Sequence, residues 1–239
     1  MTTPVAAPAL VRLGRVESTQ AVAFTLAARG AADRTVVLAE AQTAGRGRRG
    51  RTWYDEPGAS LLMSVILRPR LEPPQLPTLS LAAGVAVAEA LARVTGLDAR
   101  VKWPNDLLVG GRKLAGILLE SRLTPAPLVV LGIGINLAQR AFPPDLADRA
   151  TSVRLATGRT VDREALLRAV LESLDTWRGH LETDGWEPVR ERWRSLADTL
   201  GRRVTVEGVT GVAVDLDEDG ALILADGDQR HRVVAGEIA

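Results

Sequence analysis

The chain has 239 residues, 46% hydrophobic and 25% charged, which is typical of a globular protein with one substantial domain and a smaller one. Its formal net charge of +1 argues against a general nucleic-acid-binding surface. Cysteine is absent, which excludes disulfides and thiolate catalysis, and two widely separated histidines disfavour a zinc site.

The N-terminus, MTTPVAAPAL, has no basic region and no long apolar core, so it does not resemble a signal peptide. No run of about 18 apolar residues is present, and we therefore expect no membrane-spanning segment. These two features predict a cytoplasmic protein.

Strand and helix patterns alternate along the first half of the chain. Five elements are expected there, in chain order: a strand at 11–16, a helix at 19–29, strands at 34–40 and 59–69, and an apolar helix at 78–95. Ser18 and Thr19 are suited to cap the first helix, and Gly30 to end it.

The turn Pro104-Asn105-Asp106 precedes a predicted hairpin around Gly110-Gly111, a dipeptide that accepts the positive φ angles of a type I′ turn. A strand at 127–135 and helices at 162–182 and 187–199 follow. From Gly201 the pattern changes to short strands, with turn signals at Asp219-Gly220 and Asp226-Gly227. We therefore expect an α+β domain over residues 1–200 and a small β-barrel over 201–239.

The glycine-rich segment GRGRRG at 45–50 matches the dinucleotide pattern G-x-G-x-x-G by its letters. That pattern needs a helix at its third glycine and an acidic residue about twenty positions later, and neither is present. A Walker A loop is excluded because no Lys-Ser or Lys-Thr follows. What remains is a loop from Gly45 to Arg51 in which glycines space four arginines, Arg46, Arg48, Arg49 and Arg51. It is consistent with an anion site, a solvated basic turn or a nucleic-acid patch.

The use of lysine and asparagine points to a second region. Of 30 lysine and arginine residues only Lys102 and Lys113 are lysines, and Asn105 and Asn136 are the only asparagines. All four lie between positions 102 and 136. Lysine is a compact charge on a flexible stem, whereas arginine is a wide planar fork, so a tight anionic pocket can require lysine.

Three blocks closely resemble biotin protein ligases in composition, order and spacing: AEAQTAGRGRRGRTW at 39–53, VKWPNDLLVGGRKLAGILLE at 101–120 and GIGIN at 132–136. The likeness extends weakly to Glu17-Ser18-Thr19 and to the C-terminal strands. It implies a mixed-sheet catalytic domain similar to class II aminoacyl-tRNA synthetase and biotin protein ligase cores, followed by an SH3-like β-barrel. Only 17 residues precede Ser18, so we expect the short form without an N-terminal DNA-binding domain.

The resemblance implies an ATP- and Mg²⁺-dependent, AMP-forming ligase. Biotin and ATP would give biotinyl-5′-AMP, and biotin would then pass to a lysine of the biotin carboxyl carrier protein domain of biotin-dependent carboxylases. A monomer or homodimer is expected, without DNA or membrane as a partner. Because a carboxylate must approach a triphosphate, positioned cations are chemically necessary.

By the same resemblance, Lys113, Arg48 and Lys102 are the expected catalytic residues. Biotin is expected to contact Ser18, Thr19, Gln20, Gln42, Gly45, Arg46, Gly47, Arg48, Trp53, Lys113 and Gly116. The residues expected to bind ATP are Arg48, Arg51, Lys102, Asn105 and Asn136, with Asp106 near the metal. Simpler structural roles remain open for several of them: Ser18 and Thr19 as helix caps, Gln42 as a loop polar group, and Trp53 as a core residue.

Two positions depart from the family pattern. Gln20 stands where asparagine is common, which favours a backbone rather than a side-chain contact there. The sequence ends at Ile238-Ala239, where relatives often continue with a basic residue.

The nearest alternative is a lipoate or octanoate ligase or transferase of the same superfamily. The polar set Ser18, Thr19 and Gln42 favours a ureido ring over an apolar dithiolane, because buried N–H and C=O groups need partners.

Overall fold

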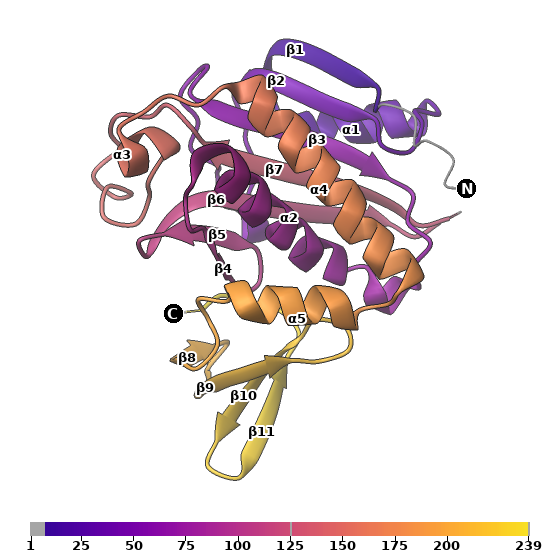
Figure 1. The fold of residues 1–239 in the computed structure, drawn as a ribbon. Helices are drawn as coiled ribbons and strands as arrows, with labels where there is room; N and C mark the ends of the chain where they lie inside the picture. The colour runs from indigo at the N-terminus through magenta and orange to yellow at the C-terminus, as the bar shows by residue number, and fades with distance from the viewer. Residues whose placement is uncertain (1–7, 125, 239) are drawn as a thin grey trace. The chain divides into compact units, whose positions relative to one another are not determined.

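The computed structural model describes residues 8–124 and 126–238 (Figure 1). Its chain divides into two compact units. The first unit comprises the residues up to Pro69 together with Leu118–Gly134, and the second comprises Arg70–Ile117 and the chain from Ile135 onward. The two units are groups of residues whose Cα atoms pack closely together, and they are not the two sequence domains expected above. The expected domain boundary at residue 200 stays a prediction.

Seven strands form a mixed sheet in the order β1-β2-β3-β7-β6-β5-β4. Their bounds are β1 Leu10–Val16, β2 Val36–Gln42, β3 Ser60–Leu67, β4 Arg100–Lys102, β5 Asp106–Val109, β6 Arg112–Arg122 and β7 Leu128–Asn136. β1 pairs with β2 in parallel, whereas β2–β3, β4–β5 and β5–β6 are antiparallel. β6 and β7 each have residues in both units.

In the first unit, helix α1 (Thr19–Ala28) packs on the strands through small residues. Ala23 and Ala27 meet Val37 of β2, Ile66 of β3 and Val130 of β7 in one buried cluster. All eight residues of β3 are buried, which explains its nearly continuous apolar sequence. The short side chains on α1 bring its N-terminal residues, Thr19 and Gln20, close to the sheet.

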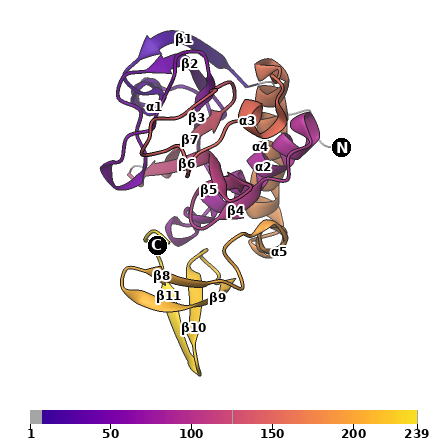
Figure 2. The same ribbon diagram turned by 90° about the vertical axis from the view of Figure 1, so that its left-hand side faces the viewer.

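In the second unit, helices α2 (Thr78–Thr95) and α4 (Arg163–Thr183) pack side by side in both ribbon views (Figures 1 and 2). The segment Pro73–Thr95 is apolar and long enough to cross a membrane, but 67% of its most apolar window is buried inside the protein, as expected of a core helix. The remaining helices are α3 (Val153–Thr157), α5 (Glu187–Leu196) and the 3₁₀ turns η1 (Arg48–Gly50) and η2 (Pro73–Gln75).

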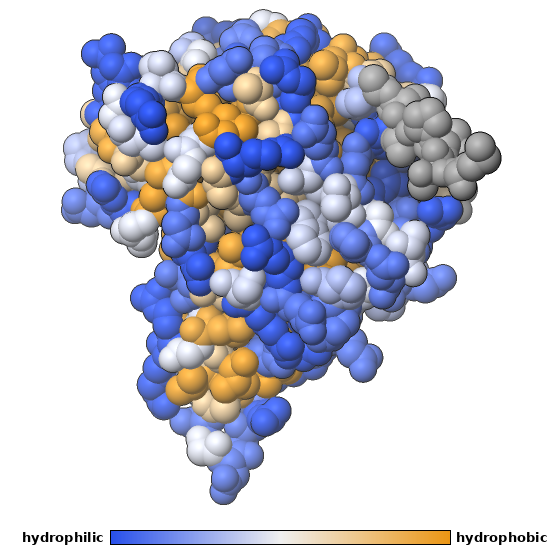
Figure 3. Space-filling view, viewed as in Figure 1, coloured by the Kyte–Doolittle hydropathy of each residue, from blue (hydrophilic) through white to orange (hydrophobic). Residues whose placement is uncertain are grey.

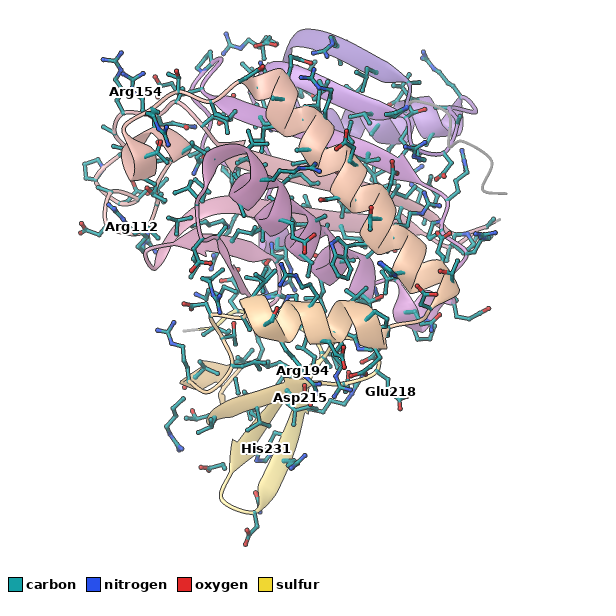
Figure 4. The ribbon with its side chains drawn as sticks, in the orientation of Figure 1. Arg112, Arg154, Arg194, Asp215, Glu218 and His231 are labelled. Carbon is teal, nitrogen blue, oxygen red and sulfur yellow. The ribbon has the colours of Figure 1, made fainter. Side chains whose placement is uncertain are left out.

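The C-terminal strands form a separate four-stranded antiparallel sheet in the order β11-β10-β9-β8. Their bounds are β8 Arg203–Val206, β9 Val209–Leu216, β10 Leu222–Asp226 and β11 Gln229–Val233. Figure 3 shows apolar side chains on the visible surface of this sheet, and Val214 of β9 is among the exposed apolar residues. Arg190 and Arg194 of α5 both bind the carboxylate of Asp215 on β9, and Figure 4 shows the Arg194–Asp215 pair.

Most expected elements are confirmed within a few residues. The helix at 78–95 has the predicted bounds, Ser18 caps α1 by accepting from the Gln20 N–H, and Gly110 and Gly111 both have positive φ in the β5–β6 turn. The expected mixed α+β class is also confirmed. β4 and α3 were not predicted, because they are three and five residues long and too short to show a period.

Candidate active site

The arginine loop, residues 45–53, folds as a tight hairpin. Its two arms are joined by hydrogen bonds from Gly47 N–H to Arg51 O, at 2.7 Å, and from Trp53 N–H to Gly45 O, at 3.0 Å. Arg48–Gly50 form the tip as a single 3₁₀ turn, in which Arg49 and Gly50 have positive φ angles. No long helix begins at Gly50, in agreement with the rejection of the dinucleotide motif.

A cavity of about 520 Å³ lies beneath this hairpin and is lined by residues 44–52 with Leu118 and Glu120 of β6. Arg46 is held at its edge by Glu120, through Nη2–Oε2 and Nη1–Oε1 distances of 3.0 and 3.3 Å. The cavity therefore has several cationic side chains and one fixed carboxylate along its wall. Glu120 was not identified from the sequence as a site residue, although it ends the KLAGILLE block.

A polar cluster connects the start of α1 to β2 and β3 in the same unit. Gln42 Oε1 accepts from the Thr19 backbone N–H at 2.8 Å and from the Thr19 hydroxyl at 3.1 Å. The backbone N–H is an obligate donor, which fixes the amide oxygen toward Thr19 and turns Gln42 Nε2 to the Gly45 side. Gln42 can then donate to a ligand carbonyl.

Ser64 of β3 completes this cluster. Its hydroxyl lies 2.8 Å from Thr19 Oγ1 and 2.9 Å from Gln20 Oε1, and it is fully buried. The single proton of Ser64 can go to Thr19 Oγ1 or to Gln20 Oε1, and the Thr19 proton goes to Gln42. In either case Thr19 Oγ1 keeps at least one lone pair that can accept a ligand N–H. A serine at the centre of an otherwise apolar strand was the one signal that would have identified it.

Gln20 is buried and its amide is used within the fold. Its Nε2 donates to Val130 O at 3.0 Å and to Leu118 O at 3.3 Å. A Cβ at Gly132 would lie 2.8 Å from Gln20 Oε1, so this glycine makes room for the amide. These bonds favour the backbone over the side chain of Gln20 as the expected ligand contact.

Trp53 lies against the second glycine of GIGIN. A Cβ at Gly134 would come within 2.7 Å of Trp53 Cε2, closer than real contacts allow. Glycine is therefore needed at 134 for the indole to lie flat on β7. Trp53 is half-buried and packs against β7 at the end of the arginine loop, and its expected contact with biotin stays a prediction.

In the second unit, three expected residues lie side by side across neighbouring strands. Lys102 of β4 is the register partner of Asp106 of β5, which is the partner of Gly116 of β6. Directly opposed residues share one face of a sheet, and Gly116 places no side chain beside Asp106 on that face. This arrangement brings the two positions expected for ATP and metal together.

Lys113 joins this group through its side chain. Its Nζ lies 2.6 Å from Asp106 Oδ1, and the two side chains are 36% and 25% exposed. Its backbone is fixed by hydrogen bonds from Lys113 N–H to Arg149 O and from Thr151 N–H to Lys113 O. The lysine is thus held firmly at its Cα while its ammonium group stays partly accessible.

The two asparagines are each tied to the fold. Asn105 Nδ2 donates to Ile117 O at 2.7 Å and its carbonyl accepts from Ile117 N–H, which fastens the turn to β6. Asn136 is 4% exposed and donates to Thr151 O at 3.0 Å. Their expected contacts with ATP stay predictions.

The residues around Asp106 fit a magnesium ion held mainly by phosphates. Mg²⁺ is commonly bound by one or two carboxylates, with substrate phosphates and waters as its other ligands. Asp106 supplies one partly exposed carboxylate. Among the described residues there is no cluster of three or more His, Cys, Asp or Glu, so these residues form no all-protein metal cage.

Comparison with known proteins finds matches to both parts of the chain. Residues 13–136 match the biotin/lipoate A/B protein ligase family, and residues 199–239 match the biotin protein ligase C-terminal domain. The chain is 37% identical to the biotin–[acetyl-CoA-carboxylase] ligase of Paracoccus denitrificans, over 95% of this chain and 98% of the relative. It is 34% identical to the bifunctional ligase/repressor BirA of Bacillus subtilis, over 93% of this chain and 71% of that protein.

Among solved structures, the biotin protein ligase of Aquifex aeolicus in complex with biotin and ATP is similar with a TM-score of 0.85. The two are 32% identical, with 97% of each chain covered. The identity and coverage are high enough to decide the family, so this chain belongs to the biotin protein ligases.

Proposed function

We propose that this chain adenylates biotin with ATP and transfers it to a lysine of a biotin carboxyl carrier protein, in the cytoplasm. The proposed chemistry follows the name of the Paracoccus denitrificans relative, a biotin–[acetyl-CoA-carboxylase] ligase, and the biotin and ATP held by the Aquifex aeolicus structure. The observation that carries the choice of biotin is the Thr19–Gln42–Ser64 network, a partly buried polar cluster suited to a ureido ring.

The ureido group carries two N–H donors and one carbonyl acceptor, all of which lose water on binding. Gln42 Nε2 is oriented to donate to the carbonyl, and Thr19 Oγ1 to accept from an N–H. A buried amide without such partners costs roughly 1–3 kcal/mol on protein scales. The apolar dithiolane of lipoate would leave the same protein groups unpaired.

In the first step, a biotin carboxylate oxygen attacks the α-phosphorus of ATP, and the bond to the pyrophosphate leaving group breaks. Both reactants are anions, so positioned cations must lower their repulsion. Arg48 at the hairpin tip, with Lys113 and Lys102 in the second unit, are the residues we assign to this work. Mg²⁺, when bound near Asp106, supplies further charge neutralisation on the phosphates.

In the second step, the carrier lysine attacks the acyl carbon of biotinyl-5′-AMP, an amide bond forms and AMP leaves with the electron pair. The lysine loses a proton in this step. Lys113 is assigned to the oxygens of the acyl-phosphate linkage, where its charge stabilises the leaving phosphate.

The test is pyrophosphate exchange into ATP, driven by biotin, lipoate or octanoate in parallel. We expect biotin to support exchange at least about 10²-fold better than lipoate or octanoate. The apolar groups of those two acids would leave the hydrogen-bonding groups of the polar cluster without partners. A preference for lipoate or octanoate would instead assign the chain to the lipoate branch of the superfamily.

A further inference from the structure

The backbone on both sides of Lys102 is held by the segment that leads into the C-terminal sheet. Val101 O accepts from Asp198 N–H at 2.8 Å, and Val101 forms a parallel bridge with Ala197. On the other side, the Trp103 backbone N–H donates to Thr199 Oγ1 at 2.9 Å. Lys102 therefore lies between two residues whose positions are set by 197–199.

The Trp103 side chain adds a third connection. It is 2% exposed, and its indole Nε1 donates to the carbonyl of Gly220 at 3.1 Å, across 117 residues of sequence. Gly220 belongs to the turn Asp217–Gly220 that joins β9 to β10. A residue of the KWPND motif is thus bonded directly to the C-terminal sheet.

That turn is itself braced. Asp217 Oδ1 accepts from the N–H groups of Asp219 and Ala221, at 3.2 and 2.9 Å. The indole of Trp186 donates to Asp217 O at 2.7 Å, and Arg232 forms ion pairs with both Asp217 and Asp219.

Gly220 has a φ of +82°, and a Cβ there would lie 2.6 Å from Leu81 Cδ1 of α2. The turn is therefore fixed against a core helix, and the Gly220 carbonyl is a rigid acceptor.

We infer that Thr199 and the Gly220 carbonyl, acting through Trp103, are positioning groups for Lys102. A lysine ammonium ends a flexible four-carbon stem, so its reach depends on where the backbone places its Cα. A displacement of about 1 Å in a catalytic group can cost on the order of 10²-fold in rate. The inference rests on the proposed role of Lys102 toward the ATP phosphates.

The test uses two variants of the full-length protein that each remove one bond. Thr199→Val removes the hydroxyl that accepts from Trp103 N–H, and Trp103→Phe removes the indole donor while keeping a ring in the core. We expect each to raise the KM for ATP about 5- to 10-fold, with biotin affinity in the absence of ATP unchanged. Thr199→Ser, which retains the hydroxyl oxygen, should restore a KM for ATP close to that of the unmodified protein.

Two matched controls remove the same chemical groups elsewhere in the second unit. Thr205→Val removes an exposed hydroxyl that bonds Thr210, and Trp177→Phe removes an indole donor to Glu89. Neither should change the KM for ATP. If Thr199→Val does not fold, Trp103→Phe alone decides the question.

The inference is overturned if the KM for ATP is unchanged in Trp103→Phe, or if biotin affinity falls by the same factor, since that indicates general loosening. Lys102→Ala separates this failure from failure of the proposed function. A normal KM for ATP in Lys102→Ala would remove the ATP role itself. A raised KM in Lys102→Ala beside a normal one in Trp103→Phe would overturn only the positioning role.

Discussion

Arg46 of the arginine loop and Glu120 of β6 form a two-bond ion pair, with Nη2–Oε2 and Nη1–Oε1 distances of 3.0 and 3.3 Å. The partners are 74 residues apart in sequence, and the pair fastens the hairpin over its cavity. Both side chains are partly exposed, at 46% and 34%, so the pair is weak enough to open. A loop with so many arginines should close fully only when an anion joins them.

We therefore predict that Glu120→Gln loosens the hairpin without unfolding the protein. Trypsin should cleave within residues 44–54 about 2- to 5-fold faster than in the unmodified chain. An effect of this size is expected because a partly exposed ion pair stabilises the closed hairpin only weakly. Biotin with ATP should protect the loop in both proteins, because the adenylate adds a phosphate anion beside the arginines. Glu172→Gln, which removes an exposed partner of Arg93, is the control. Equal cleavage with and without ligands would contradict the ordering of the loop by adenylate.

Lys113→Ala is expected to lower both pyrophosphate exchange and transfer to the carrier by at least about 10²-fold, the effect of losing one preorganised donor. The fold should remain intact, since the backbone bonds to Arg149 and Thr151 do not involve the side chain. Unchanged circular dichroism and thermal midpoint would verify this. Arg112→Ala removes the neighbouring exposed cation (Figure 4) and should retain near-normal activity. Similar losses in both variants would refute the assignment to Lys113.

Gln42→Glu tests the orientation of the amide. A glutamate keeps the oxygen that accepts from Thr19 but cannot donate to the ureido carbonyl. We expect biotin affinity, measured calorimetrically without ATP, to fall about 10-fold or more, since an unpaired buried acceptor costs roughly 1–3 kcal/mol. Gln229→Glu adds the same charge at an exposed position of β11 and should leave biotin affinity unchanged. Unaltered affinity in Gln42→Glu would mean that Gln42 has only a structural role.

The ion pairs of Asp215 predict a pH-dependent contribution to stability. Partial burial raises the pKa of Asp215. The hydrogen bonds from Arg194 and from the Leu216 N–H, together with the charge of Arg190, lower it by more, so the pKa of Asp215 lies below its ordinary value of 3.8. A carboxylate with a depressed pKa stabilises the folded state above its ordinary pKa, and this stability is lost as the pH falls through the folded value.

Asp215→Asn should accordingly lower the free energy of unfolding at pH 7 by roughly 1 kcal/mol. The difference from the unmodified protein should shrink as the pH falls through the depressed pKa of the native carboxylate. Urea titrations at pH 7 and at the lowest pH at which the unmodified protein stays folded measure both values. Asp226→Asn, which affects an exposed pair with Arg203, serves as the control. A difference that is the same at both pH values would exclude the ionised carboxylate as its source.

Much of the fold could be predicted because its signals are local. Ser18 caps α1 by a bond to a residue two positions away, and the apolar run at 78–95 is long enough to specify α2 without its neighbours. Gly110 and Gly111 adopt the positive φ angles that a tight hairpin requires, whatever surrounds them. The three sequence blocks also identified the chemistry, because the order and spacing of the arginine loop, the two lysines and GIGIN can be read directly along the sequence.

Only the tertiary structure decided which side chains support these motifs. Ser64, Glu120 and Thr199 contact Thr19, Arg46 and Trp103 across 45, 74 and 96 residues, and nothing in the local sequence encodes such pairs. It also gave reasons for glycines that the motif leaves unexplained, since Gly134 accommodates Trp53 and Gly132 accommodates Gln20. A motif specifies which functional groups are present. The packing of distant strands and turns specifies where those groups are held and which atoms they present to a ligand.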